Sequence, residues 1–270
     1  MAKRPSLDNF LKSPYIVIST LPYRVLTAKV ENNFSHILSM NSLDRKINLL
    51  KIIVEEYVKS ATPVSSSFIV EKYFKDLSSA TIRNDMAELE KNNLICQPHT
   101  SAGRVPTIEG YKKYLDSFIS NGEITKEERA ILDKIKAIDI RQKTKEVAKA
   151  VAELASNAVF VGFEKNDYFY TGISNLFRQP EFRESAYLYN MSEIIDHLDE
   201  AISQVASNLK SDQIKILIGA DNPFGEFSSV IIARYGSGNP DGLIGLLGPN
   251  RLDYRRGLGL ITYAQELLIK

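Results

Sequence analysis

Hydrophobic residues recur at helical spacing in the first part of the chain, and this pattern predicts three successive helices. The third is the clearest, because Ile82, Met86 and Leu89 lie at i, i+4 and i+7 and form one apolar stripe. Hydroxyl groups can cap the second helix at Ser65 or Ser66 and the third at Ser78 or Ser79. The predicted helices are Leu43–Ser60, a short helix that ends at Tyr73, and a helix that ends before Asn92.

Two short strands are predicted directly after the third helix. Leu94–Gln97 and Arg104–Val105 have strand-like content, and the residues from Pro98 to Gly103 form the tip of a hairpin between them. Gly103 allows the backbone to turn or to approach another segment closely. Three helices followed by a hairpin is the order of a winged helix-turn-helix, whose recognition helix enters the major groove of DNA.

The face of the third helix opposite its apolar stripe carries small residues and side chains that can recognise bases. In the major groove, arginine pairs well with guanine and asparagine with adenine. Arg83 has no carboxylate three or four residues away, so an intrahelical ion pair does not explain it. Asn84 fits base recognition and an ordinary helix position equally well, and a plain surface hairpin would also account for the polar tip. The candidate DNA-binding residues are Ser79, Thr81, Arg83, Asn84, Lys91, His99, Thr100, Ser101 and Arg104.

Residues 121–156 are predicted to be a helical linker. Thr125 is followed by Glu128 three residues later, which is a capping box that starts a helix. Apolar stripes continue to about Leu154, with an expected break near Asp139–Arg141. Two interpretations are open: the linker helices bind a partner, or they pack on the domain that follows.

The last part of the chain, residues 157–270, is predicted to be an α+β domain. Its strands come largely in succession, so we expect an antiparallel sheet with helices on one face, a layout compatible with a small-molecule sensor site. The predicted strands are Ala158–Phe163, Tyr168–Ile173, Ile214–Ile218, Ser228–Tyr235 and Leu243–Leu247, and the predicted helices lie near Ser192–Leu209 and Asp253–Ile269.

The first 41 residues precede all of these elements and form an extension for which two structures are considered. Tyr15–Ser19 and Arg24–Val30 have strand-like content. We expect a loosely attached arm, or translation that starts near Met40; the alternative is a short strand pair docked on the body. The predicted domain boundaries are 1–41 for the extension, 42–120 for the winged helix-turn-helix, 121–156 for the linker and 157–270 for the α+β domain.

Composition narrows the class of protein further. The chain has 270 residues, 44% of them hydrophobic, which is enough for two cores, and no apolar run approaches the ~20 residues that a transmembrane helix needs. The single cysteine, Cys96, excludes an internal disulfide and a multi-cysteine metal site. Residues 43–118 hold eleven Lys and Arg against ten Asp and Glu, so DNA affinity must come from the placement of charges and from pairing two domains. A cytoplasmic location is expected.

No arrangement of residues in the sequence indicates an enzyme. Gly242, Gly245 and Gly248 are three residues apart, but no helix follows them in the way that a phosphate-binding loop requires. The three histidines form no metal triad, and the isolated aspartates occupy turn and cap positions without a base or nucleophile as partner. We therefore expect no catalytic residue, no metal and no cofactor.

Several stretches of this sequence resemble the HrcA heat-inducible transcription repressors of bacteria. The stretches are Pro63–Ser66, Ser78–Leu89, Gln97–Thr107, Gly172–Leu176, Gln179–Phe182 and Gly248–Tyr254, within a resemblance that covers roughly residues 42 to 268. The resemblance implies a homodimeric repressor of chaperone operons that binds double-stranded DNA at an inverted-repeat operator. It also implies a GAF-like second domain and modulation of activity by a GroE-type chaperonin.

One departure from the family pattern concerns the second domain. The family carries a long segment, with an inserted dimerisation region, before the stretch that corresponds to Gly172–Leu176. Here Val159–Phe163 is followed almost at once by Tyr168–Gly172, so that segment is missing and a different dimer surface is expected. The alternative function is a winged-helix module that senses a ligand or binds a protein without reading an operator.

Overall fold

The computed structural model divides into two compact units, one made of residues 21–118 and the other of residues 1–20 together with 119–270. We call them the helical unit and the sheet unit. The structure describes residues 42–137, 139–164, 167–210, 213–220, 222–236 and 242–269, together with the backbone of 15–18.

The helical unit contains the three predicted helices and the predicted hairpin, followed by a fourth helix that the sequence pattern did not predict. Its elements are α1 Ser42–Ser60, α2 Ser66–Lys72, α3 Ser79–Lys91, β2 Ile95–Cys96, β3 Val105–Pro106 and α4 Ile108–Phe118. The signal for α4 is present in the sequence, since the buried residues Tyr111, Tyr114 and Leu115 recur at helical spacing. An isolated bridge between Val64 and Arg104 ties β3 to the connection between α1 and α2.

The sheet unit is built on a six-stranded antiparallel sheet with the strand order β1-β6-β7-β8-β4-β5. Its strands are β1 Tyr15–Ile18, β4 Ala158–Glu164, β5 Asp167–Thr171, β6 Ile214–Ile218, β7 Ser228–Tyr235 and β8 Gly242–Pro249. The five strands predicted after residue 157 are thus confirmed: β6 and β7 have the predicted ends, and the ends of β4, β5 and β8 differ by at most two residues. Strands β4 and β5 pair directly with each other and are close neighbours in sequence.

The strand β1 joins part of the N-terminal extension to the sheet. Tyr15 pairs with Leu217 and Ile18 with Ile214, in antiparallel register along β6, so β1 is an edge strand of the sheet. The backbone of residues 15–18 is therefore a strand docked on the sheet, and the prediction of a loosely attached arm is wrong for these four residues. The second strand considered, Arg24–Val30, lies outside the described residues.

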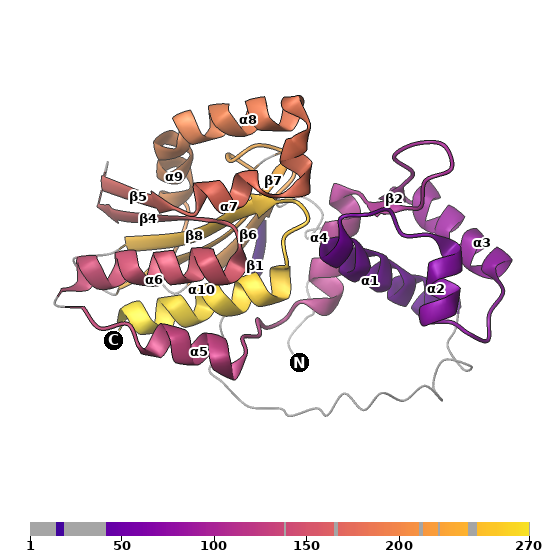
Figure 1. The fold of residues 1–270 in the computed structure, drawn as a ribbon, viewed down its shortest axis with the longest axis horizontal. Coiled ribbons are helices and arrows are strands. Elements are labelled where there is room, and N and C mark those ends of the chain that lie inside the picture. The colour runs from indigo at the N-terminus through magenta and orange to yellow at the C-terminus, as the bar shows by residue number, and fades with distance from the viewer. Residues whose placement is uncertain are drawn as a thin grey trace, which may run out of the picture. The chain divides into compact units, whose positions relative to one another are not determined.

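Helices cover both faces of the sheet, so the expectation of helices on one face is wrong (Figure 1). Helices α6 and α10 lie on one face, and α7, α8 and α9 lie on the other. The physical reason is visible in β6, β7 and β8, whose residues are apolar almost without alternation, as expected for strands buried on both sides. The helical elements are α5 Lys126–Asp133, α6 Ile140–Ala155, α7 Ile173–Phe177, the 3₁₀ helix η3 Pro180–Arg183, α8 Ser185–Asp196, α9 Leu198–Ala206 and α10 Tyr254–Ile269.

The linker helices α5 and α6 pack on the sheet unit. The expected capping box at Thr125 and Glu128 is present at the start of α5, and the expected break separates α5 from α6. Val147 and Val151 of α6 are fully buried, and Arg256 of α10 donates to the Glu128 carboxylate at 2.6 Å. Of the two interpretations of the linker, the structure therefore supports packing on the following domain.

The glycines of β8 are explained by packing and not by a phosphate loop. A Cβ atom at Gly245 would overlap the ring of Phe160 on the neighbouring strand β4. That ring is itself stacked on Phe224, with 5.1 Å between the ring centroids, so it has little freedom to move. Gly245 is thus the residue that makes room for an aromatic pair in the core.

We predict that Gly245→Ala lowers the free energy of unfolding of the sheet unit by about 2–3 kcal/mol, because the new methyl group would displace a buried ring. The matched control is Gly257→Ala on α10, where the nearest atoms are the Cδ1 of Ile231 at 2.8 Å and the Cδ2 of Leu246 at 3.0 Å. These side-chain ends can shift, so the control should be affected less. Urea unfolding followed by circular dichroism measures both changes, and equal losses would contradict the assignment.

Candidate nucleic-acid interface

Two serine hydroxyls hold the start of α3. Ser78 is the N-cap, and its Oγ accepts the backbone N–H of Thr81 at 3.0 Å. The hydroxyl of Ser79 lies 3.2 Å from that of Ser66, the first residue of α2. Of the two candidates for the cap, the structure selects Ser78, and Ser79 joins the two helices instead.

An ion pair fixes the rotation of α3 relative to α1. Arg45 of α1 donates through Nε and Nη2 to the two carboxylate oxygens of Asp85, at 2.6 and 3.0 Å. Asp85 is only 4% exposed, and the predicted stripe of Ile82, Met86 and Leu89 is buried beside it. With this side of α3 turned inward, the opposite side is turned outward.

The outward face of α3 presents Arg83, Asn84 and Lys91, all of them exposed. Six of the eleven Lys and Arg residues between 43 and 118 form ion pairs with carboxylates. Within the described part of the chain, neither Arg83 nor Lys91 has an ion pair or a side-chain hydrogen bond. Internal pairing therefore neutralises much of the unit and leaves these two cations available on one helix.

The hairpin tip is braced by its own residues and exposes the predicted donors. The N–H of Ala102 donates to the carbonyl oxygen of His99 at 3.0 Å, and the amide of Gln97 donates to the carbonyl oxygen of Ala102 at 3.0 Å. Ser101 takes a left-handed conformation with φ of 69°, which closes the turn. His99, Thr100 and Ser101 are all exposed, as the sequence predicts.

Arg104 differs from the expectation that it offers a free donor to DNA. Its Nε and Nη2 lie 3.1 and 3.0 Å from the Oε2 of Glu90, a residue near the end of α3. Its backbone N–H and carbonyl group both bond to Val64, at 2.8 and 2.9 Å. The Arg104 side chain is thus paired with α3.

A buried carboxylate joins α1 to the end of α2. Glu56 is 6% exposed, and it accepts hydrogen bonds from the Tyr73 hydroxyl at 2.6 Å and from the Lys72 ammonium at 2.9 Å. Burial by itself raises the pKa of Glu56, but the hydrogen bonds from Tyr73 and Lys72 and the nearby charges outweigh burial and lower it below its ordinary value. The carboxylate is therefore held in its charged form.

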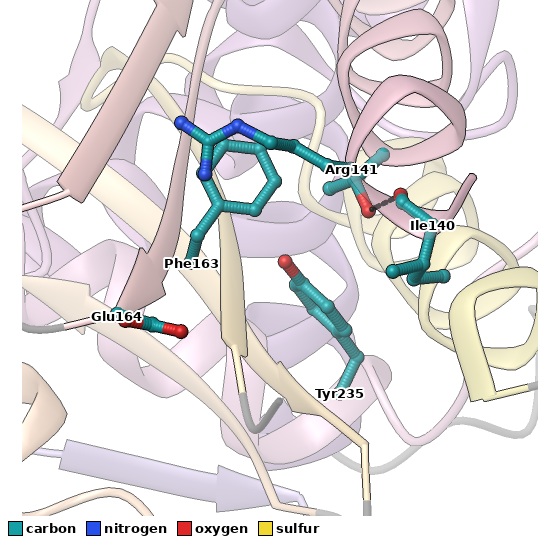
Figure 2. A pocket seen from close by; sticks show the side chains of 6 residues that line it. Ile140, Arg141, Phe163, Glu164 and Tyr235 are labelled. Atoms are coloured by element: carbon teal, nitrogen blue, oxygen red, sulfur yellow. Dashed lines mark hydrogen bonds between the residues drawn. The ribbon is translucent and has the colours of Figure 1, made fainter. Parts of the chain in front are cut away.

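The sheet unit contains a small pocket (Figure 2). It has a volume of about 200 Å³ and is lined by residues of α6, β4 and β7, including Phe163, Glu164 and Tyr235. The guanidinium carbon of Arg141 lies 4.2 Å from the centroid of the Phe163 ring, and the same group is paired with Asp167 at 2.8 Å. The pocket is smaller than most ligand sites, and its one cation already has a partner. It therefore gives no support to a small-molecule sensor site, with which the α+β layout is compatible.

Among the described residues, no group of three or more His, Cys, Asp or Glu side chains is placed to hold a metal ion. No described helix has the length and apolar content required to cross a membrane.

The structure adds residues to the site that sequence reasoning missed. Glu90 binds Arg104, Gln97 braces the hairpin tip, and Asp85 with Arg45 orients α3. Asp85 had a usable signal, because its position on the inner side of the predicted helix makes a buried partner necessary. Glu90 and Gln97 had none, since their partners depend on how the hairpin folds back.

The fold and the site together define a protein with a helix-and-hairpin unit that exposes unpaired cations, and with a separate mixed sheet unit. The family model described as "HrcA protein C terminal domain" matches residues 91–257. The chain therefore belongs to the HrcA family.

Similar proteins of known name agree with this assignment. A protein of Natranaerobius thermophilus named "Heat-inducible transcription repressor HrcA" is 25% identical over 329 aligned positions, which include 83% of this chain and 95% of that protein. A protein of Acetivibrio thermocellus with the same name is 39% identical over 119 positions, 43% of this chain and 34% of its own. A solved structure described as "Crystal structure of a hypothetical protein at 2.2 A resolution" has a TM-score of 0.69 at 20% identity, covering 84% of this chain and 97% of its own, and so shares the fold.

The alignment with the Natranaerobius protein also shows a difference in length. Since 83% of 270 residues is about 224, about 105 of the 329 aligned positions have no residue of this chain. The related protein thus contains residues without counterpart here, while β4 and β5 follow each other directly in this chain.

We predict that the helical unit loses stability as the pH falls below the ordinary value of 4.5 for glutamate, and that Glu56 contributes to this loss. The lowered pKa of Glu56 stabilises the folded state above that value, and the contribution disappears as the pH falls through the pKa of the folded state. Glu56→Gln should be less stable than wild type at pH 7, with a difference that narrows on acidification.

Urea unfolding across pH, with the exposed Glu71→Gln on α2 as control, measures this effect. An unchanged difference between wild type and Glu56→Gln at all pH values would count against the role of the Glu56 carboxylate.

Proposed function

We propose that the helical unit is a winged helix-turn-helix and that the chain is a sequence-specific repressor of transcription of chaperone operons. One observation carries the DNA-binding part: α3 exposes Arg83 and Asn84 opposite its buried stripe, beside a braced hairpin with an exposed polar tip. Membership of the HrcA family supports the repressor role, because the related proteins are named heat-inducible transcription repressors.

In this proposal α3 enters the major groove, and its side chains read bases. Arg83 would recognise a guanine and Asn84 an adenine, because their donors and acceptors match the edges of those bases. Ser79, Thr81 and Lys91 would contact phosphates at the two ends of the helix, and the small residues Ala80 and Ala87 would allow close approach. His99, Thr100 and Ser101 of the tip would contact phosphate or the minor groove.

The proposal includes a homodimer bound to an inverted repeat. The helical unit has almost no net charge, so one copy should bind DNA weakly at physiological salt, and two copies on one duplex gain from being linked. For two modules on one face of DNA, the half-sites should lie about 34 Å apart or a multiple of it.

The sheet unit would be a GAF-like regulatory and dimerisation domain. The unmatched positions in the relatives support a dimer surface that differs from one built on an inserted segment. A GroE-type chaperonin as modulator rests on the family resemblance alone. The domain boundaries at residues 42–120, 121–156 and 157–270 belong to this proposal as well.

The probe is a duplex that the wild-type chain selects from a random library. We predict that Arg83→Ala weakens the free energy of binding to this duplex by roughly 1–3 kcal/mol and has a much smaller effect on a scrambled duplex. Lys91→Ala should weaken binding to both duplexes alike and reduce the salt dependence by about one phosphate contact. The control is Lys126→Ala, an exposed cation on α5 of the sheet unit.

Fluorescence anisotropy across a salt series measures these effects. Small and equal effects of Arg83→Ala and Lys91→Ala on both duplexes would reject operator recognition. They would instead favour a winged-helix module that senses a ligand or binds a protein.

A further inference from the structure

The ion pair between Arg104 and Glu90 joins the hairpin to α3. The Nε of Arg104 donates a hydrogen bond to Oε2 of Glu90 at 3.1 Å, and Nη2 lies 3.0 Å from the same oxygen. The Arg104 side chain is 21% exposed and that of Glu90 36%. A pair with this much solvent access contributes little to global stability, so its value must lie in the geometry that it imposes.

The backbone at the same position is held from a second side. Arg104 and Val64 exchange two hydrogen bonds, so β3 is fastened to the connection between α1 and α2. A Cβ atom at Gly103 would lie 2.5 Å from the Val64 carbonyl carbon, which shows how closely the two segments approach. Arg104 is therefore the residue at which the hairpin, the α1–α2 connection and α3 meet.

The hairpin tip leads directly out of this junction. The bonds from Ala102 to His99 and from Gln97 to Ala102 make the tip a small braced unit of its own. Such a unit moves as one piece, so its direction relative to α3 is set at its base. The base is Arg104.

We propose that Arg104 is a positioning residue: its ion pair with Glu90 sets the hairpin tip against α3, so that both can contact one DNA duplex. The effect of this positioning on DNA binding rests on the proposed function. It assigns a role to Glu90, an acidic residue that no electrostatic argument for DNA binding would retain.

Arg104 has two conceivable roles, and removal of the Glu90 charge changes the DNA affinity in opposite directions for the two. If Arg104 binds a phosphate and Glu90 competes with DNA for it, removing the Glu90 charge must strengthen binding. If the pair positions the tip, the same change must weaken binding. Glu88→Gln is the matched control, because it removes the same charge from the same helix, from a carboxylate that is paired with Lys46 and more exposed at 56%.

The DNA arm of the experiment uses Glu90→Gln, Arg104→Gln and the double exchange Glu90→Arg with Arg104→Glu. The probe is a duplex selected from a random library by the wild-type chain, measured across a salt series. Relative to Glu88→Gln, we expect each single variant to lose roughly tenfold in affinity and the exchange to recover most of it, as for directly coupled pairs. The salt slope should stay unchanged, because residues 98–103 of the tip include no lysine or arginine.

Three results would overturn the positioning role in this arm. They are tighter binding by Glu90→Gln than by Glu88→Gln, a salt slope reduced by about 0.9 in Arg104→Gln alone, and an exchange variant weaker than either single variant. Each of them would indicate that Arg104 contacts a phosphate directly.

A second arm needs no DNA and so separates this inference from the proposed function. Hydrogen exchange of the Arg104 and Val64 amides should accelerate several-fold in Glu90→Gln and in Arg104→Gln, return toward wild type in the exchange variant, and not change in Glu88→Gln. Unchanged hydrogen-exchange rates in the two single variants would overturn the role of the ion pair between Arg104 and Glu90 in holding the hairpin. If the wild-type chain selects no duplex from the library, the proposal of operator binding is rejected. The hydrogen-exchange rates would still decide whether the ion pair holds the hairpin.

Discussion

The rotation of α3 about its own axis is the constraint on which the candidate DNA surface depends. Burial of Ile82, Met86 and Leu89 sets that rotation coarsely, and the ion pair between Arg45 and Asp85 sets it more finely. A carboxylate that is almost fully buried must keep its cationic partner, because an unpaired buried charge is strongly unfavourable. With the inner face so determined, Arg83 and Asn84 can only point outward.

Ion pairing inside the helical unit gives this surface its electrostatic character. A unit with nearly equal numbers of acidic and basic residues is a poor general binder of polyanions. Six of the eleven Lys and Arg residues between 43 and 118 pair with carboxylates, among them Asp85, Glu56 and Glu90. On α3, by contrast, Arg83 and Lys91 have no such partner among the described residues. Such an arrangement favours selectivity over strength, because few unpaired charges pull on phosphates in general.

The sheet unit illustrates how packing on both faces restricts the sequence. Strands covered by helices on two sides have no face turned to solvent, so most of their residues are apolar and must fit one another in size. At position 245 only glycine leaves room for the ring of Phe160, which is stacked on Phe224. The same covering helices include α6, which explains why the linker belongs to this unit.

Much of the fold was predictable because it depends on near neighbours in sequence. The apolar stripe of α3, the serine caps and the capping box at Thr125 involve residues within a few positions of each other, and all three were found as predicted. The prediction of helices on one face was wrong, because the succession of strands does not show whether one or both faces of a sheet are covered. The apolar runs within β6, β7 and β8 are the sign of burial on both faces. The partners of Arg45 and Arg104 lie 40 and 14 residues away, and no local pattern indicates them.

The sequence by itself thus determined the elements and their inward faces, since periodicity and capping are local. Only the tertiary structure decided which charges pair, because pairing requires segments distant in sequence to come within a few ångströms.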